Sequence, residues 1–130
     1  MAHNLKAAID DMKASIEGVD FSPKVELEDQ QKGAKNLVTI IPSSVETEYN
    51  FGSVKMYHTL SVRLYCSATS TDPATVQDRC RKINEALAGD RKRGGNAQTT
   101  ITADWDEETY EGRSLVVMVS EPQIQTIETC

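Results

Sequence analysis

Several protein classes are excluded by what this chain of 130 residues lacks. No apolar run approaches the ~20 residues of a membrane span. The N-terminal MAHNLKAAIDDMK has neither the basic start nor the apolar middle of a signal peptide, so we expect synthesis and folding in the cytoplasm. Three cysteines at wide spacing form neither a disulfide framework nor a zinc pattern. We expect Cys66 and Cys80 to be small buried hydrophobes and Cys130 to be exposed.

Signatures of catalysis and of cofactor binding are also missing. The sequence contains no G-x-S-x-G, no P-loop and no G-x-G-x-x-G after a strand. His3 lies in a terminus that we expect to be loose, and His58 lies on the inward face of a strand, where a packing role is expected. We therefore predict that the protein is not an enzyme and holds no cofactor and no metal ion.

The balance of charge is acidic, with a formal net charge of −6 and an isoelectric point near 4.9. Nucleic-acid binding needs a basic surface that neutralises phosphates. We therefore predict no specific binding of nucleic acid. An acidic surface is nevertheless suited to face a passing polyanion without holding it.

One very long strand stands out among the features that are present. Apolar and polar residues alternate without a break from Val54 to Cys66, which predicts a strand with one inward face. At ~3.3 Å per residue it spans roughly 40 Å, about twice an ordinary strand. A core of this size cannot cover it, so we expect its outer part to project and to pack against another copy of the chain. The predicted subunit-interface residues are Tyr49, Phe51, Val54 and Met56.

Phe51 lies at the turn between this strand and its expected hairpin partner, Val45–Tyr49. Two interpretations of the aromatic side chain remain open. It either folds back onto its own hairpin or makes a subunit contact at the hairpin tip.

The order of elements predicts the fold class. A helix over about Asn4–Glu17 is followed by a long polar segment, Val19–Lys35, with a short strand near Lys24–Leu27. Pro42 predicts a break or bulge before the long hairpin. A second helix opens at Asp72-Pro73, and two more strands follow. We expect one domain, 1–130, with an α+β fold in which two helices pack on a largely antiparallel sheet with a long projecting β-hairpin.

The expected core combines one stripe from each helix with the inward faces of the strands. Its predicted members are Ile9, Met12, Ile16, Leu60, Val62, Leu64, Val76, Ile83, Leu87, Ile101, Val117 and Val119.

Two charged clusters each allow more than one role. The basic run Arg91, Lys92 and Arg93 fits either a flexible loop after a helix or a docking loop for an acidic partner. An acidic cluster fits a solvated connection, a face turned to a channel, or a cation site, although its order does not match an EF-hand. Its members are Asp104, Asp106, Glu107, Glu108 and Glu111.

The chain resembles the tail terminator, or tail completion, proteins of long-tailed bacteriophages. The resemblance covers nearly the whole chain and lies in the strand HTLSVRLYCS, the helix pattern D-P-x-x-V-x-x-x-C-x-x-I and the stretch INEALAGDRKRGGNAQTTITADW. The polar segment Val19–Lys35 has no counterpart in it. The resemblance implies a hexameric ring that ends growth of the tail tube and joins it to a head-side connector or stopper protein. DNA passes through such a ring, and the family has no catalytic residues.

The resemblance therefore places the protein in the tail or neck of a virion, after synthesis in the host cytoplasm. Two alternatives remain. One is another small head–tail joining (neck) protein, and the other is a cytoplasmic α+β module for oligomeric interaction or ligand binding.

Overall fold

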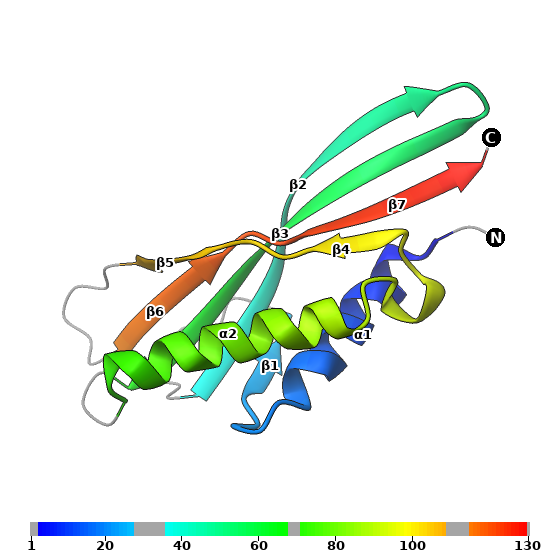
Figure 1. Ribbon diagram of the computed structural model, residues 1–130. Helices are drawn as coiled ribbons and strands as arrows, with labels where there is room; N and C mark the ends of the chain where they lie inside the picture. Colours follow the sequence, from blue (N-terminus) through cyan, green and yellow to red (C-terminus); the bar gives the residue numbers. More distant parts are fainter. Residues whose placement is uncertain (1–2, 28–35, 68–70, 109–114, 130) are drawn as a thin grey trace.

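The computed structural model describes residues 3–27, 36–67, 71–108 and 115–129. It confirms the α+β fold: two helices lie on one face of a seven-stranded, mostly antiparallel sheet (Figure 1). Two positions named above, Glu111 and Cys130, lie outside the described residues. Within these ranges no helix is both long and apolar enough to cross a membrane.

Both helices begin where the sequence predicts. In α1 (Leu5–Glu17) the side chain of Asn4 accepts a hydrogen bond from the amide of Ala7, which satisfies a free N–H of the first turn. In α2 (Pro73–Gly89) Asp72 accepts in the same way from the amide of Thr75 at 2.7 Å. Hydrogen bonds from the side chain of Thr75 and from this amide lower the pKa of the Asp72 carboxyl. The buried helix residues make two apolar stripes, formed by Ala8, Met12, Ile16, Val76, Cys80, Ile83 and Leu87.

The sheet begins with a short strand that the sequence predicts, β1 (Lys24–Glu26), which runs parallel to β2 (Asn36–Asn50). An antiparallel ladder joins β2 to β3 (Ser53–Ser67) over their whole lengths. Its register shifts between Pro42 and Ser44, which confirms the expected irregularity. The chain continues through this bulge as one strand.

The long strand β3 is the centre of the sheet. Its inner half pairs with β6 (Leu115–Ser120), which also pairs with β5 (Trp105–Glu108). Its outer half pairs with β7 (Gln123–Thr129), which also pairs with β4 (Thr99–Ile101). Between the two partners, the amide of Leu60 donates to the carbonyl of Pro122 at 3.0 Å. The hydrogen bonding along that side of β3 is therefore nearly continuous.

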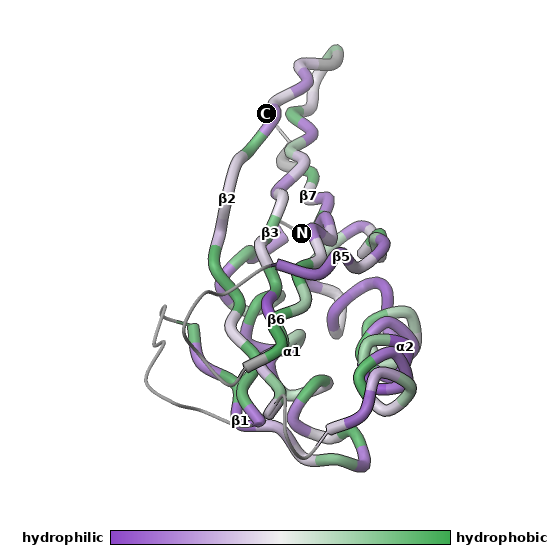
Figure 2. Tube along the Cα trace, turned by 90° about the vertical axis from the view of Figure 1, so that its left-hand side faces the viewer, coloured by the Kyte–Doolittle hydropathy of each residue, from purple (hydrophilic) through white to green (hydrophobic). Residues whose placement is uncertain are grey.

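The outer halves of β2 and β3, together with β7, leave the body as a narrow projection that we call the arm (Figures 1 and 2). The predicted long hairpin is therefore present. Its third strand, β7, supports the arm over seven residue pairs.

For two strands, β4 and β6, the prediction of which side chains face the helix-side core is wrong. Ile101 is 43% exposed, because β4 aligns Thr100 with the buried Ile124 and so turns Thr100 inward. In β6 the side chains of Val116 and Met118 pack against the helix-side core. The expected core residue Val117 is buried in a separate cluster on the other face of the sheet, with Leu37, Tyr65 and the partly buried Val119.

Candidate functional site

The arm carries apolar side chains on one of its two faces. The strand register aligns Val54 with Tyr49, Met56 with Thr47, and His58 with Val45. Residues that face each other across an antiparallel ladder lie on the same side of the sheet. Two of the predicted interface residues, Val54 and Met56, therefore share this face with Tyr49, and both are half-buried in the single chain.

Exposure rises towards the tip of the arm. The exposed fraction is 55% at Val45, 80% at Tyr49 and 110% at Phe51. The interpretation in which Phe51 folds back on its own hairpin is therefore wrong. Gly52 beside it has φ 81°, a left-handed conformation that suits the tight turn. Val45, Tyr49 and Phe51 are thus three large exposed apolar side chains on one projection, and contiguous apolar patches are the surfaces that mark interaction sites.

The other face of the arm is mostly polar, although Ile127 of β7 lies opposite Lys55 on it. The hydroxyl of Tyr57 donates to Glu48 at 2.9 Å, and the ammonium of Lys55 lies 5.4 Å from the centre of the Tyr57 ring. These contacts pair Tyr57 with Glu48 and with Lys55 within the arm itself. The two faces therefore differ in kind, and the apolar face is the one suited to burial against a partner.

His58 lies in the middle of the apolar face, half-buried as the sequence suggests. Its Nε2 lies 3.0 Å from the hydroxyl oxygen of Thr126 on β7. This hydrogen bond fastens β7 to β3 at the root of the arm. The contact gives His58 a structural role there.

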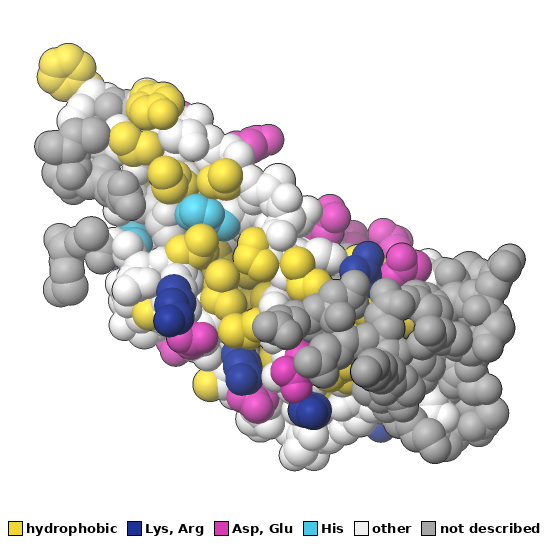
Figure 3. All heavy atoms as spheres, turned by 180° about the vertical axis from the view of Figure 1, so that it is seen from behind, with side chains coloured by type: hydrophobic (Ala, Val, Ile, Leu, Met, Phe, Trp, Pro, Cys, Tyr) yellow, Lys and Arg dark blue, Asp and Glu magenta, His cyan; other side chains and the backbone are white. Residues whose placement is uncertain are grey.

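An apolar groove lies where the arm meets the body, between α1 and β2. Its volume is about 320 Å³, with Lys6 and Asp10 at the rim. On the face of the molecule seen from behind, hydrophobic side chains form a band that runs from the arm to the body (Figure 3). We call the arm face and this groove together the apolar stripe. The apolar lining of the groove is Leu5, Ile9, Leu27, Ile40 and Pro42.

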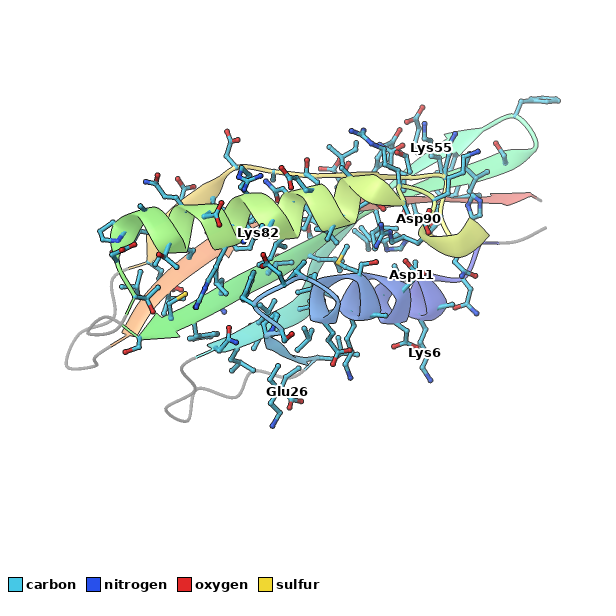
Figure 4. All side chains as sticks on the ribbon, turned by 60° about the horizontal axis from the view of Figure 1, so that its bottom comes forward. Lys6, Asp11, Glu26, Lys55, Lys82 and Asp90 are labelled. Atoms are coloured by element: carbon cyan, nitrogen blue, oxygen red, sulfur yellow. The ribbon has the colours of Figure 1, made fainter. Side chains whose placement is uncertain are left out.

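The basic run after α2 does not act as a unit, and the prediction that Arg93 docks a partner is wrong. Its side chain is fully buried. It donates to the carbonyls of Asp90 at 2.6 Å and Leu87 at 2.8 Å, and to the hydroxyl of Ser15 at 3.1 Å. An ion pair with Asp11 at 3.2 Å completes the set. Asp11 and Asp90 approach this junction from α1 and from the end of α2 (Figure 4).

The reason for this burial is the backbone at η1 (Arg93–Gly95). Arg93 has φ 50°, which turns its side chain inward between the two helices. Burial lowers the pKa of its guanidinium, and the nearby carboxylates of Asp11 and Asp90 oppose that shift. Arg91 and Lys92 remain exposed, so a docking role for these two residues stays a prediction.

The acidic cluster lies mostly within a strand and not in a connection. Asp106, Glu107 and Glu108 belong to β5, and Asp104 directly precedes it. They line an open hollow of about 570 Å³ that also includes Glu121. Arg63 donates to Glu108 at 3.1 Å. Asp104, Asp106 and Glu107 are exposed, so their role towards a channel stays a prediction.

Two further kinds of site were considered among the described residues, namely metal-binding clusters and reactive thiols. No three His, Cys, Asp or Glu side chains in the described ranges are grouped to hold a metal ion. Cys66 and Cys80 are buried and free, as expected. Burial raises the pKa of both thiols, in the case of Cys80 to about 12, which keeps them protonated and unreactive.

Sequence reasoning missed the groove. Ile9 was expected only as a core residue of the first helix, although Ile9 and Leu5 line the groove and pack at the margin of the core. Pro42 was predicted only as a break or bulge before the long hairpin. A single sequence does not indicate which helix packs beside which strand, so the groove between α1 and β2 could not be predicted from it.

Neither a protein-family model nor a curated protein matches this chain by sequence. Its fold, however, matches solved structures. One of them is a chain in the structure entitled "Virion of native gene transfer agent (GTA) particle". The match has a TM-score of 0.68 and 12% sequence identity, and covers 95% of this chain and 93% of that chain. At that identity, the likeness establishes a shared fold across almost the full length of both chains.

Proposed function

We propose that this protein is a structural component of a phage-like virion, and within it the tail terminator. In this role it forms a ring at the head-proximal end of the tail tube, ends tube growth and joins the tail to a head-side connector. Two observations support the proposal: the fold shared with a chain of a virion particle, and the projecting arm.

The observation that carries the proposal is the apolar face of the arm, which ends in the fully exposed Phe51. Burying three large side chains, Val45, Tyr49 and Phe51, contributes at most roughly 4.5–9 kcal/mol at about 1.5–3 kcal/mol each, before the cost of association. One arm and one body on each copy favour a head-to-tail contact, which closes into a ring if the rotation allows.

The further parts of the proposal concern partners. Six copies are favoured through the family resemblance. In the ring, Asp104, Asp106 and Glu107 face DNA that passes without binding, because like charges repel. Arg91 and Lys92 dock onto an acidic surface of the tail tube protein or of the head-side stopper. The protein catalyses no reaction and needs no cofactor.

Oligomeric state tests the assembly. We expect the wild-type protein to form rings, visible by light scattering and negative-stain microscopy, and the double variant Val54→Asp with Met56→Asp to give folded monomers. Lys55→Asp is the matched control, because it changes the net charge by the same two units on the opposite face of the same strand. A double variant that still forms full-size rings would refute the interface, as would a wild type that stays monomeric at every concentration and in virions.

Tail length tests the terminator role against the role of another neck protein. Particles assembled without the protein should carry tubes of uncontrolled length, and added wild-type protein should restore a fixed length. The monomeric double variant should not restore it. Tubes of normal length that merely fail to join heads would favour the other neck role.

A further inference from the structure

We propose that Phe51 of one copy inserts into the groove between α1 and β2 of the next copy. This inference rests on the ring proposed above and assigns its two contact sites. The donor is the arm tip, and the acceptor is a site that the sequence alone did not reveal.

The occupant of the groove cannot be the Phe51 of the same chain. Pro42 lines the groove and belongs to the same strand that leads to the tip. Phe51 lies nine positions further along the chain, so the two lie roughly 30 Å apart at ~3.3 Å per residue. The pairing of β3 with both β2 and β7 holds the strand extended. The arm therefore reaches away from its own groove and can fill only that of another copy.

The size and chemistry of the groove fit an aromatic ring. A cavity of ~150 Å³ lined by aliphatic side chains is enough to bind benzene, and this groove holds about 320 Å³. Its walls come from Leu5, Ile9 and Leu27, and Leu27 is 38% exposed in the free chain. The acidic hollow beside β5 is larger but lined by carboxylates, which do not match an aromatic side chain. This groove is therefore an apolar counterpart of the tip.

The spacing also fits neighbouring copies. A compact domain of 130 residues has a diameter of about 35 Å, close to the ~30 Å between tip and groove. A copy placed beside the first is thus within reach of its arm. Because tip and groove lie at the two ends of the apolar stripe, each copy both gives and receives one contact. This is the requirement for a ring built from one repeated interface.

Disulfide trapping tests the contact directly. In a Cys130→Ser background, Phe51→Cys is combined in turn with Leu5→Cys, Ile9→Cys or Leu27→Cys, and the assembled protein is oxidised. Cys66 and Cys80 are buried and do not interfere. Phe51→Cys with Ala14→Cys is the matched control, because Ala14 is exposed on α1 outside the groove. We expect a ladder of covalent multimers from at least one groove pair and none from the control, because a disulfide needs Cα atoms within ~7 Å.

Phe51→Ala gives a second measurement. The free monomer should keep its thermal midpoint, because the side chain is fully exposed, whereas association should weaken about 10- to 100-fold. Rings that form normally while no groove pair is trapped would overturn this inference and leave the proposed function standing. A wild-type protein that forms no ring under any condition would overturn both.

Discussion

Replacement of the buried Arg93 by alanine tests whether the helix junction depends on one side chain. Arg93 joins the end of α2 to α1 through three hydrogen bonds and one ion pair. Alanine removes all of them and leaves the carbonyls of Leu87 and Asp90 without this donor. Asp11 keeps partial access to water, because its side chain is 34% exposed.

The magnitude follows from these contacts. Hydrogen bonds to a charged group contribute ~1.5–3 kcal/mol each, but the buried guanidinium also carries a cost of desolvation. Breaking a buried charged pair typically costs ~3–5 kcal/mol, and water reaches Asp11, so we expect a loss of about 3 kcal/mol. For a domain of this size that corresponds to a fall of roughly 10 °C in thermal midpoint.

Urea and thermal unfolding of the variants measure this loss. Arg91→Ala with Lys92→Ala is the control, and because both residues are exposed we expect a change within ~0.5 kcal/mol. Arg93→Gly should be about 1 kcal/mol more stable than Arg93→Ala, because glycine adopts the φ of 50° without strain. A loss below ~0.5 kcal/mol for Arg93→Ala, or equal losses for Arg93 and the control pair, would refute the structural role.

Three further predictions concern the core. Truncating either Leu64 or Ile83 to alanine should cost ~2–5 kcal/mol in urea unfolding, since both are fully buried, and changes below ~0.5 kcal/mol at both would mean that the faces are misassigned. In a Cys130→Ser background, a thiol reagent at pH 8 should label Cys80 only after unfolding, because its pKa is raised from 9.0 to about 12. The same shift means that stability present below about pH 9 is lost as the pH rises towards 12, because the unfolded chain releases the thiol proton first. Rapid labelling of the native protein would contradict both expectations.

The fold could be predicted where local pattern decides the structure. The period of two from Val54 to Cys66 predicted β3, and the helix starts at Asn4 and Asp72 followed from capping chemistry. Pro42 indicated the bulge because it has no amide proton to donate.

The errors have a common physical cause, since each depends on contacts between distant segments. β4 has only three residues, so its alternation fits either face, and pairing with β7 decides it. Arg93 was read as surface charge because its partner Ser15 lies 78 positions away in the sequence. The support that β7 gives to the arm depends likewise on a non-local ladder.

The unbroken course of β3 through body and arm has a consequence for how subunits would be arranged. At the root of the arm β3 keeps a partner on this side, because the bond from Leu60 to Pro122 fills the step from β6 to β7. The arm is thus preorganised, and its direction relative to the helices is set by the twist of the sheet before any partner arrives. In the proposed ring, the angle between neighbours is therefore a property of the monomer backbone. Interface side chains would govern how tightly the ring holds, while the twist of β3 would govern how many copies close it.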